Sequence, residues 1–174
     1  NPKQSRSLLY VHKTSPVMIT GIRASAEIAV TMGFSHIQFQ QVTPAREDSV
    51  NAYLKSVEPV PSPYLTQDGR LTESAQRGKK LFDDKARCVR CHVPPFYGDR
   101  RKMVLGLGSD DDRDREFATP MLIECWRTAP YMYDGRALSV EDVITTDNIN
   151  NVHGNTKDLS EQERKDLVEY ILSL

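Results

Sequence analysis

The sequence has no hydrophobic run long enough to cross a bilayer, few aromatic residues and almost no net charge. Lys and Arg together number 23 and Asp and Glu 24, so the formal net charge is −1, and aromatic residues make up 7%. Nucleic-acid binding needs a basic surface and stacking platforms, so we expect no nucleic-acid partner. We expect no membrane span either, and we recognise no internal repeat. The remaining composition, 39% hydrophobic and 27% charged, is that of a globular protein.

Cysteine is also scarce, yet two of the three cysteines stand in one motif. Cys88 and Cys91 enclose two residues and His92 follows directly, which is the attachment signature of a c-type haem. Two thiols one helical turn apart can add to the two vinyl groups of one porphyrin, and the adjacent imidazole then serves as the proximal iron ligand. The third, Cys125, lies in an apolar stretch and is expected to be an inert buried thiol.

Two other uses of a Cys-x-x-Cys pair compete with haem attachment. A thioredoxin-like redox pair usually follows a strand, and nothing at residues 75–90 reads as one. A zinc site could combine the two cysteines with His92 and His153, but a histidine directly after the second cysteine is wrong for a zinc finger. The sequence therefore predicts one covalently attached haem c, with its iron on His92.

The first 60 residues carry no ligand pattern. A short helix is expected near residues 25–34 and a strand near 36–40, where apolar and polar residues alternate. Thr43 and Pro44 then read as the cap and first residue of a helix. That helix places four apolar residues on one face and should dock on another surface; they are Val50, Tyr53, Leu54 and Val57.

Three prolines at residues 59–63 predict a stiff connector, which gives a segment 1–60, a linker 61–70 and a domain 71–174. The first segment is interpreted as a small mixed segment packed on the domain or a remnant of a preceding domain. Thr72 can cap a helix that ends just before the haem motif. Ser160 and Glu163 form a capping box for a last helix.

The domain resembles class I cytochromes c. The residues that carry the likeness are the run Gly-Lys-Lys-Leu-Phe at 78–82, the Cys-x-x-Cys-His motif, and Leu167 and Tyr170 in the closing helix. In that family the glycine lets the first and last helices cross closely, and the aromatic residues seal the crossing. The resemblance implies a mostly α fold around one covalent haem.

A second stretch resembles the C-terminal haem domain of bacterial dihaem cytochrome c peroxidases. The likeness rests on Thr-Pro-Met-Leu at 119–122 and Thr-Ala-Pro-Tyr-Met-Tyr-Asp-Gly-Arg at 128–136. The sequence departs from the family at Ile123, where an arginine helps to hold a haem propionate, and at Tyr133, where the family has histidine. It also contains no second Cys-x-x-Cys-His motif.

The sixth iron position separates an electron carrier from a catalyst, because a filled position favours outer-sphere transfer and an open one admits peroxide or gas. We predict His153 as the distal ligand, since it lies 61 positions after His92 and seven before Ser160, with Gly154 beside it. Met132 is the main alternative, and a different methionine or an open site is a further one; the other methionines considered are Met103 and Met121.

Four arginines are candidates to pair with the haem propionates, because guanidinium offers two parallel hydrogen bonds to a carboxylate. Arg127 is favoured, since it could replace the arginine lost at Ile123; the others are Arg100, Arg101 and Arg136. Tyr133 could line the haem pocket and donate a hydrogen bond. Trp126 is expected to pack in the core or at the haem edge.

The favoured function is one-electron transfer to an unidentified redox partner protein. A peroxidase-type haem enzyme and a haem-based redox or gas sensor are the alternatives. Covalent haem attachment takes place outside the cytoplasm, so we expect a periplasmic or other extracytoplasmic location. The sequence begins at Asn1 without a recognisable signal peptide, so we expect a processed or excised piece, with other domains in a larger parent protein.

Overall fold

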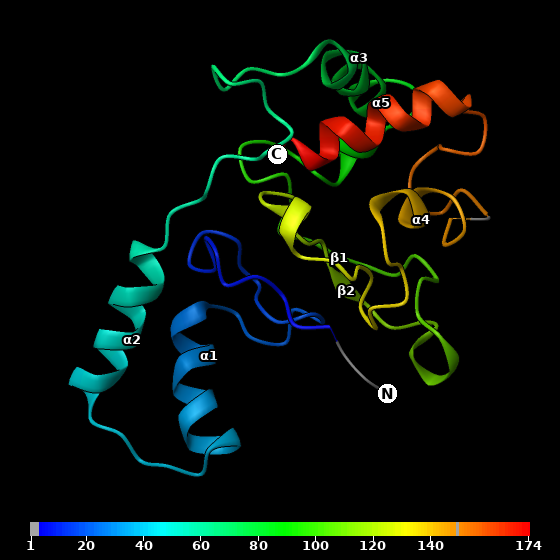
Figure 1. Ribbon diagram of the computed structural model, residues 1–174. Helices are drawn as coiled ribbons and strands as arrows, with labels where there is room; N and C mark the ends of the chain where they lie inside the picture. Colours follow the sequence, from blue (N-terminus) through cyan, green and yellow to red (C-terminus); the bar gives the residue numbers. More distant parts are fainter. Residues whose placement is uncertain (1–3, 149) are drawn as a thin grey trace.

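The computed structural model describes residues 4–148 and 150–174, and it is mostly helical (Figure 1). Its helices are α1 (Ala26–Met32), α2 (Pro44–Ser56), α3 (Glu73–Asp83), α4 (Val140–Ile144) and α5 (Glu161–Leu172), with a π turn at Gly33–Ile37 and short 3-10 turns at Cys88–Arg90, Asp110–Asp112 and Cys125–Arg127. Two short antiparallel strands, β1 (Lys102–Met103) and β2 (Phe117–Ala118), pair Lys102 with Ala118 and Met103 with Phe117. No helix of this described part is long and apolar enough to cross a membrane.

The core lies where α3 crosses α5, near the top of Figure 1. The crossing is close enough to require glycine, because a Cβ at Gly78 would lie 1.9 Å from the backbone oxygen of Asp166. The rings of Phe82 and Tyr170 meet edge to face at 5.3 Å beside it, and both are buried. The close glycine crossing implied by the class I cytochrome resemblance is thus confirmed.

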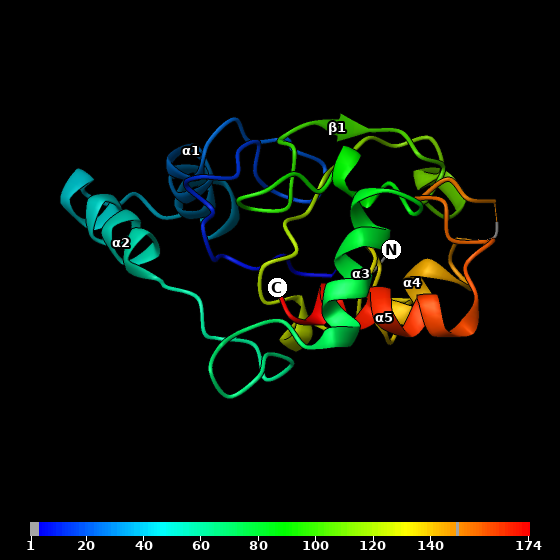
Figure 2. The same cartoon turned by 90° about the horizontal axis from the view of Figure 1, so that it is seen from above.

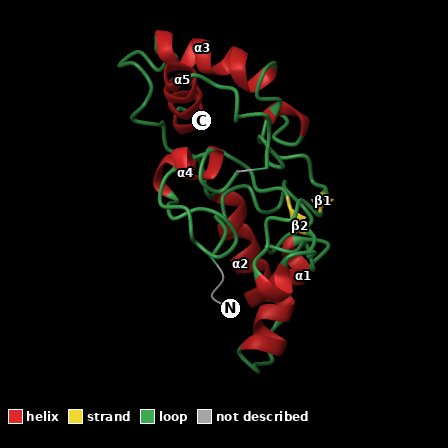
Figure 3. Ribbon diagram, turned by 90° about the vertical axis from the view of Figure 1, so that its right-hand side faces the viewer, coloured by secondary structure: helices red, strands yellow, loops and turns green. Residues whose placement is uncertain are grey.

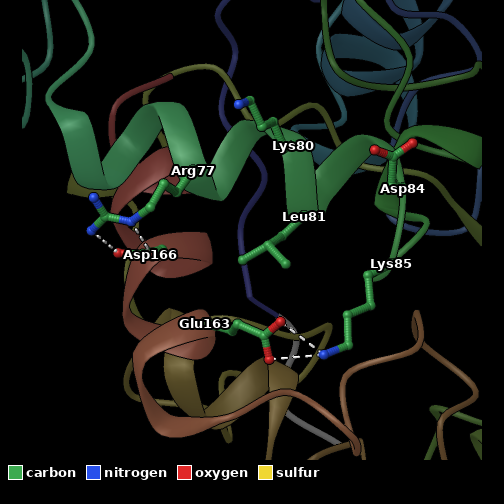
Figure 4. A pocket seen from close by; sticks show the side chains of 7 residues that line it. All are labelled: Arg77, Lys80, Leu81, Asp84, Lys85, Glu163 and Asp166. Atoms are coloured by element: carbon green, nitrogen blue, oxygen red, sulfur yellow. Dashed lines mark hydrogen bonds and ion pairs between the residues drawn. The ribbon is translucent and has the colours of Figure 1, made fainter.

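Two ion pairs join α5 to α3 and to the segment that directly follows α3 (Figure 4). Arg77 Nε lies 2.7 Å from Asp166 Oδ2, and Lys85 Nζ lies 2.8 Å from Glu163 Oε1. The hydrogen bonds from Arg77 are the main reason that the pKa of Asp166 falls to about 2. The crossing therefore combines a buried aromatic contact with charged links at its rim.

The helix starts predicted from the sequence are confirmed. Thr72 Oγ1 accepts a hydrogen bond from Ala75 N at 3.1 Å and caps α3. Ser160 and Glu163 form a reciprocal capping box at the start of α5. Each device satisfies backbone N–H groups that a helix start would otherwise leave unpaired.

The N-terminal region departs from the sequence prediction. The first helix is shorter than expected, and the predicted strand at residues 36–40 is wrong, because Gly33–Ile37 continues as a π turn. Ser35 Oγ donates to Thr31 O at 2.9 Å and favours further turning. Ile37 and Phe39 are 74% and 86% exposed. The alternating pattern therefore has no neighbouring strand on which it could form a ladder.

Helix α2 begins at Pro44, as predicted, but packs only against α1 among the described elements. Figure 2 shows the α1–α2 pair on the left, apart from α3, α4 and α5, and in Figure 3 the pair lies below α3 and α5. The connector that follows is fixed to the domain, since Ser62 Oγ donates to Leu172 O at 2.6 Å.

Residues 8–28 follow the same backbone course as residues 122–142, at a constant spacing of 114 positions, so our expectation of no internal repeat is wrong. An antiparallel bridge joins Val17 to Arg23 in the first stretch and Tyr131 to Ala137 in the second. At three aligned positions both residues have a positive φ: Tyr10 (51°) and Glu124 (61°), Met18 (72°) and Met132 (66°), and Gly21 (60°) and Gly135 (76°).

The repeat extends into the helices on either side of a loop. Ser25 caps α1 by accepting from the backbone N–H three residues on, and Ser139 caps α4 in the same way. Helix α1 packs against α2, and α4 packs against α5. Residues 4–57 therefore repeat the second half of the helical domain, without a counterpart of α3.

Candidate haem site

The Cys-x-x-Cys-His segment begins with a 3-10 turn at Cys88–Arg90, and the backbone N–H of His92 donates to Cys88 O at 2.9 Å. Both cysteines are free thiols. Burial raises the pKa of Cys88 to about 12 and also raises that of Cys91, so both sulfurs are protonated at neutral pH. The described residues hold no group of three or more His, Cys, Asp or Glu side chains that could bind a metal ion such as zinc.

His92 is buried, and its ring is held by a backbone carbonyl. Its Nδ1 lies 2.9 Å from Tyr97 O, so Nδ1 carries the proton and donates it. Burial lowers the pKa of His92, which keeps the ring neutral. Nε2 is therefore left with a lone pair for a metal, in the way that proximal histidines are usually oriented.

His153 faces His92 although 61 positions separate them in the sequence. Their ring centroids lie 6.1 Å apart, with the ring planes at 53°. An imidazole–metal bond is about 2 Å long, so two rings on one metal have centroids about 6 Å apart. Nδ1 of His153 is buried without a hydrogen-bond partner, and desolvation, together with repulsion between the protonated forms of His153 and His92, lowers the pKa of His153 to about 4. The pair fits a group with one central metal.

The loop that carries His153 is held by Asn148, a residue that sequence reasoning missed. The Asn148 Nδ2 group donates to the carbonyl oxygens of His153 and Gly154 at 3.1 and 3.0 Å, and Oδ1 accepts from His153 N at 2.8 Å. Gly154 has φ +82°, and a Cβ there would lie 3.0 Å from Ala86 O. The loop therefore rests directly on the segment that precedes Cys88.

Met132 and Tyr133 lie in the turn closed by the Tyr131–Ala137 bridge. Met132 has a positive φ of 66°. Tyr133 is buried, its ring lies 4.8 Å from that of Phe117, and its hydroxyl lies 2.6 Å from Ser109 Oγ. The roles predicted for these two side chains at a haem remain predictions.

Three of the four candidate arginines already have carboxylate partners. Arg127 pairs with Glu124, whose side chain is 2% exposed, and it lies over the Trp126 ring at 5.8 Å. Arg101 and Arg136 pair with Asp99 and with Asp134 and Asp147, respectively. Arg127 would thus bring little uncompensated charge to a propionate, and its role there stays a prediction.

Arg101 has a contact that ties it to the haem motif. Its Nη2 donates at 3.0 Å to the carbonyl oxygen of Arg90, which lies between the two cysteines. Its Nε is fixed by Asp99 Oδ2 at 2.6 Å. We therefore find Arg101 supporting the backbone of the attachment segment.

Cys125 and Trp126 differ in whether their buried polar atoms have hydrogen-bond partners. The Cys125 thiol is buried and donates to Ile171 O at 3.2 Å, and burial raises its pKa to about 12, as expected of an inert thiol. The indole Nε1 of Trp126 is buried without a hydrogen-bond partner. A buried donor of this kind ordinarily has an acceptor.

Comparison with known proteins places this geometry among haem proteins. A family model described as cytochrome c matches residues 75–174. The chain is 29% identical over 178 residues to hydrazine synthase subunit gamma of Kuenenia stuttgartiensis, covering 78% of this chain and 50% of that protein. It is 29% identical over 153 residues to cytochrome-c peroxidase IdrP1 of Denitromonas iodatirespirans, covering 60% and 41%. The chain thus spans half or less of the length of these curated relatives.

Solved structures share the fold at lower identity. Hydrazine synthase of K. stuttgartiensis matches with a TM-score of 0.82 and 23% identity, over 99% of this chain and 72% of that chain. A MauG-like protein associated with microbial copper homeostasis matches with a TM-score of 0.73 and 20% identity, over 100% and 73%. Because these matches span the whole chain, the α1–α2 pair belongs to the shared architecture.

Proposed function

The chain belongs to the cytochrome c family, and on that premise we propose that it transfers single electrons through one covalently attached haem c. Membership of the family implies the covalent haem, and the chain has one Cys-x-x-Cys-His motif for it. The observation that carries the proposal is the facing pair His92 and His153, whose centroids are 6.1 Å apart.

Each residue of the site has a defined part. The thiols of Cys88 and Cys91 would hold the haem through two thioether bonds, and His92 would offer Nε2 to its iron while Tyr97 O holds the other ring nitrogen. His153 offers the second imidazole from a loop that Asn148 fixes. A haem bound there supplies an iron that changes by one electron between Fe(II) and Fe(III).

Two filled axial positions favour outer-sphere transfer over reaction with small molecules. The imidazole also lacks the preference of a thioether for Fe(II), so a haem with two histidine ligands has a lower reduction potential than one with histidine and methionine. Support for His153 comes from its ring centroid, 6.1 Å from that of His92, and from the loop that Asn148 fixes.

Covalent attachment is tested first. The intact mass of the haem-loaded protein should exceed that of the polypeptide by one haem, and acid acetone should fail to extract the porphyrin. The variant Cys88→Ala should retain at most one thioether, which the pyridine haemochrome spectrum reports. Extractable haem in the unmodified protein would contradict the proposal.

The distal ligand is tested with two matched variants. His153→Ala should convert the ferric haem from low spin to high spin and allow rapid cyanide binding, whereas Met132→Ala should leave the spectrum low spin. The opposite pattern would assign the sixth position to Met132. A haem that is high spin without any substitution would mean that the site is open.

A peroxidase-type activity is the second candidate, and the relatives favour it. Besides the IdrP1 peroxidase, the methylamine utilization protein MauG of Methylorubrum extorquens is 28% identical over 134 residues, covering 63% of this chain and 37% of that protein. The chain also keeps Thr-Ala-Pro-Tyr-Met at 128–132. A spectrum that changes on adding hydrogen peroxide, with turnover of a reductant, would favour this candidate over electron transfer.

The proposal also covers the cellular location of the protein and its redox partner. Family members receive their haem outside the cytoplasm, so we infer a periplasmic or other extracytoplasmic location in a bacterium. The electron partner is a redox protein, and one relative is named as a subunit of hydrazine synthase. Further domains of a larger parent protein fit the greater length of the relatives.

A further inference from the structure

The loop that holds the His92 ring consists of residues 93–98, between the haem motif and β1. Its backbone is closed by a hydrogen bond from Gly98 N to Val93 O at 3.2 Å. Within this loop, Tyr97 O accepts a hydrogen bond from Nδ1 of His92 at 2.9 Å. The orientation of the imidazole therefore depends on the contacts that fix the Tyr97 carbonyl.

Tyr97 has a backbone conformation that few residues with a side chain adopt. Its φ is 52°, in the left-handed region. A conformation of this kind costs free energy and persists only where the surrounding structure holds it, and it is frequent at functional sites. The direction of the Tyr97 carbonyl follows from this conformation, so the contacts that maintain it also direct the carbonyl toward His92.

The Tyr97 side chain reaches the crossing of α3 and α5. Its hydroxyl lies 3.0 Å from the hydroxyl of Tyr170, and its ring meets that of Phe82 edge to face at 5.9 Å. Among residues 4–148 and 150–174, neither hydroxyl has another hydrogen-bond partner. Tyr170 is 2% exposed, and burial, followed by the bond to Tyr97, raises the pKa of Tyr170. Tyr97 therefore contacts His92 through its backbone and the buried core through its side chain.

We propose that Tyr97 is a positioning residue for His92, and that its hydroxyl bond to Tyr170 lets the α3–α5 crossing hold the carbonyl that orients the imidazole. The inference rests on the proposed function, because His92 acts there as a ligand of the haem iron. A carbonyl held in place accepts a stronger hydrogen bond from Nδ1, which makes the imidazole more basic and favours Fe(III). The bond between Tyr97 and Tyr170 therefore lowers the reduction potential.

The simpler explanation is that the hydrogen bond between Gly98 and Val93 alone holds the loop, and that the two tyrosine hydroxyls only stabilise the core. The two explanations differ in how the stability of the fold and the reduction potential are related. Removing one hydroxyl leaves the other buried and unpaired, whereas removing both leaves no unpaired group and restores most of the stability. With a purely structural pair, any change in potential would disappear together with the loss of stability. With a positioning pair the change would persist, because the anchor of the carbonyl is still absent.

The proposal is tested on the haem-loaded chain with substitutions that remove a hydroxyl and keep the ring. The variants are Tyr97→Phe, Tyr170→Phe and the two combined. The matched control is Tyr131→Phe, which removes a hydroxyl that donates to Cys125 O at 2.7 Å beside the same core.

A potentiometric titration measures the ratio of Fe(II) to Fe(III) at a fixed applied potential. Each single variant should raise this ratio by about two- to fivefold, since part of the free energy of one hydrogen bond reaches the iron. The combined variant should match either single variant, and Tyr131→Phe should leave the ratio unchanged. Denaturant melts should show a loss of stability in Tyr97→Phe and in Tyr170→Phe that is largely recovered in the combined variant.

The hydrogen bond of His92 is measured directly by NMR of the reduced protein. The Nδ1–H resonance of His92 should move upfield and exchange faster with solvent in both single variants and in the combined one, because the bond to Tyr97 O weakens. An unchanged potential and resonance in Tyr170→Phe, with the haem attached, would overturn the positioning role alone. So would a potential that returns to that of the parent chain in the combined variant. Extractable haem in the unmodified protein would overturn the proposed function as well, so the two failures are distinguishable.

Discussion

Residues 4–57 and 122–174 follow one plan but differ in what lies against them. Each has a bridged turn, a serine-capped short helix and a longer helix that packs on it. The second is covered by α3 and lies beside the haem motif, whereas the first leaves its longer helix exposed. The comparison shows that turns and caps specify the backbone course, while burial depends on a helix that only one half receives.

Side chains at aligned positions of α5 and α2 differ in burial and in hydrogen bonding. Counted from their first residues, the two helices align at a spacing of 117 positions. On α5, Asp166 is buried and accepts hydrogen bonds from Arg77, Ser74 and Gln162. At the aligned position of α2, Ser49 is exposed and bonds only within its own helix, to Ala45 O at 2.8 Å. A buried charge is retained where partners compensate its desolvation, and a small polar residue suffices elsewhere.

The strongest test of the comparison substitutes the two aligned tyrosines. Tyr170→Ala removes a buried ring that packs on Phe82 and should lower the free energy of unfolding by about 3–5 kcal/mol. Tyr53→Ala should change it by less than about 0.5 kcal/mol, because its ring is exposed. Denaturant melts of the two variants measure the difference, and equal losses would show that the α2 face is already covered.

Two glycines provide the next test. Gly78→Ala places a Cβ against the backbone of Asp166 and should cost about 1–3 kcal/mol through overpacking. Gly33 has open space around its Cβ position and a helical φ of −60°, so Gly33→Ala should be neutral or stabilise by about 0.4–1 kcal/mol. The thermal midpoints of the pair report both effects. An unchanged midpoint for Gly78→Ala would contradict the close crossing.

Lowering the pH should weaken the packing of α5 against α3, because it protonates Asp166. The folded pKa of Asp166, about 2, is below its ordinary value of 3.8, so its contribution is complete above that ordinary value and is lost as the pH falls through about 2. Asp166→Asn should therefore cost about 1–2 kcal/mol at pH 6, with a gap to the parent chain that closes between pH 4 and 2. Ser49→Ala, the aligned substitution, should show no such pH dependence.

The smallest expected difference lies between the two helix caps. Ser25→Ala and Ser139→Ala each remove an oxygen that accepts a backbone N–H, and each should cost about 1 kcal/mol. Ser139→Ala should cost slightly more, because Asp142 completes a capping box with it. Amide exchange of α1 and α4 would localise each loss to its own helix.

Local signals made much of the helical domain predictable. Ser160 with Glu163, Thr72 before α3 and Pro44 at the start of α2 are short-range devices, and each marks a helix start that the structure contains. The haem motif was equally clear, because its chemistry requires two cysteines and a histidine at fixed spacing. The facing of His92 by His153 followed from spacing in the family that the sequence resembles.

The features that were missed depend on contacts across the chain. Asn148 gave no motif, since its role arises only when its amide meets the His153 backbone. The predicted strand at 36–40 failed because alternation needs a partner strand, which the described fold does not supply there. The repeat escaped notice because its identical residues are scattered singly rather than grouped in a motif; these are Leu8 and Leu122, Thr14 and Thr128, Pro16 and Pro130, Met18 and Met132, Gly21 and Gly135, Ser25 and Ser139, and Glu27 and Glu141.

The hydrogen bonds of Asn148 also hold the loop that carries His153 in one conformation. Ordering each loop residue costs roughly 1–2 kcal/mol of conformational entropy, and the Asn148 amide, with Thr156 Oγ1 at 2.7 Å, offsets this cost during folding. Contacts within the polypeptide are thus sufficient to place His153 opposite His92. If the chain transfers electrons as proposed, a loop fixed in this way would limit the movement of His153 between the two oxidation states of the iron, which would keep the reorganisation energy small.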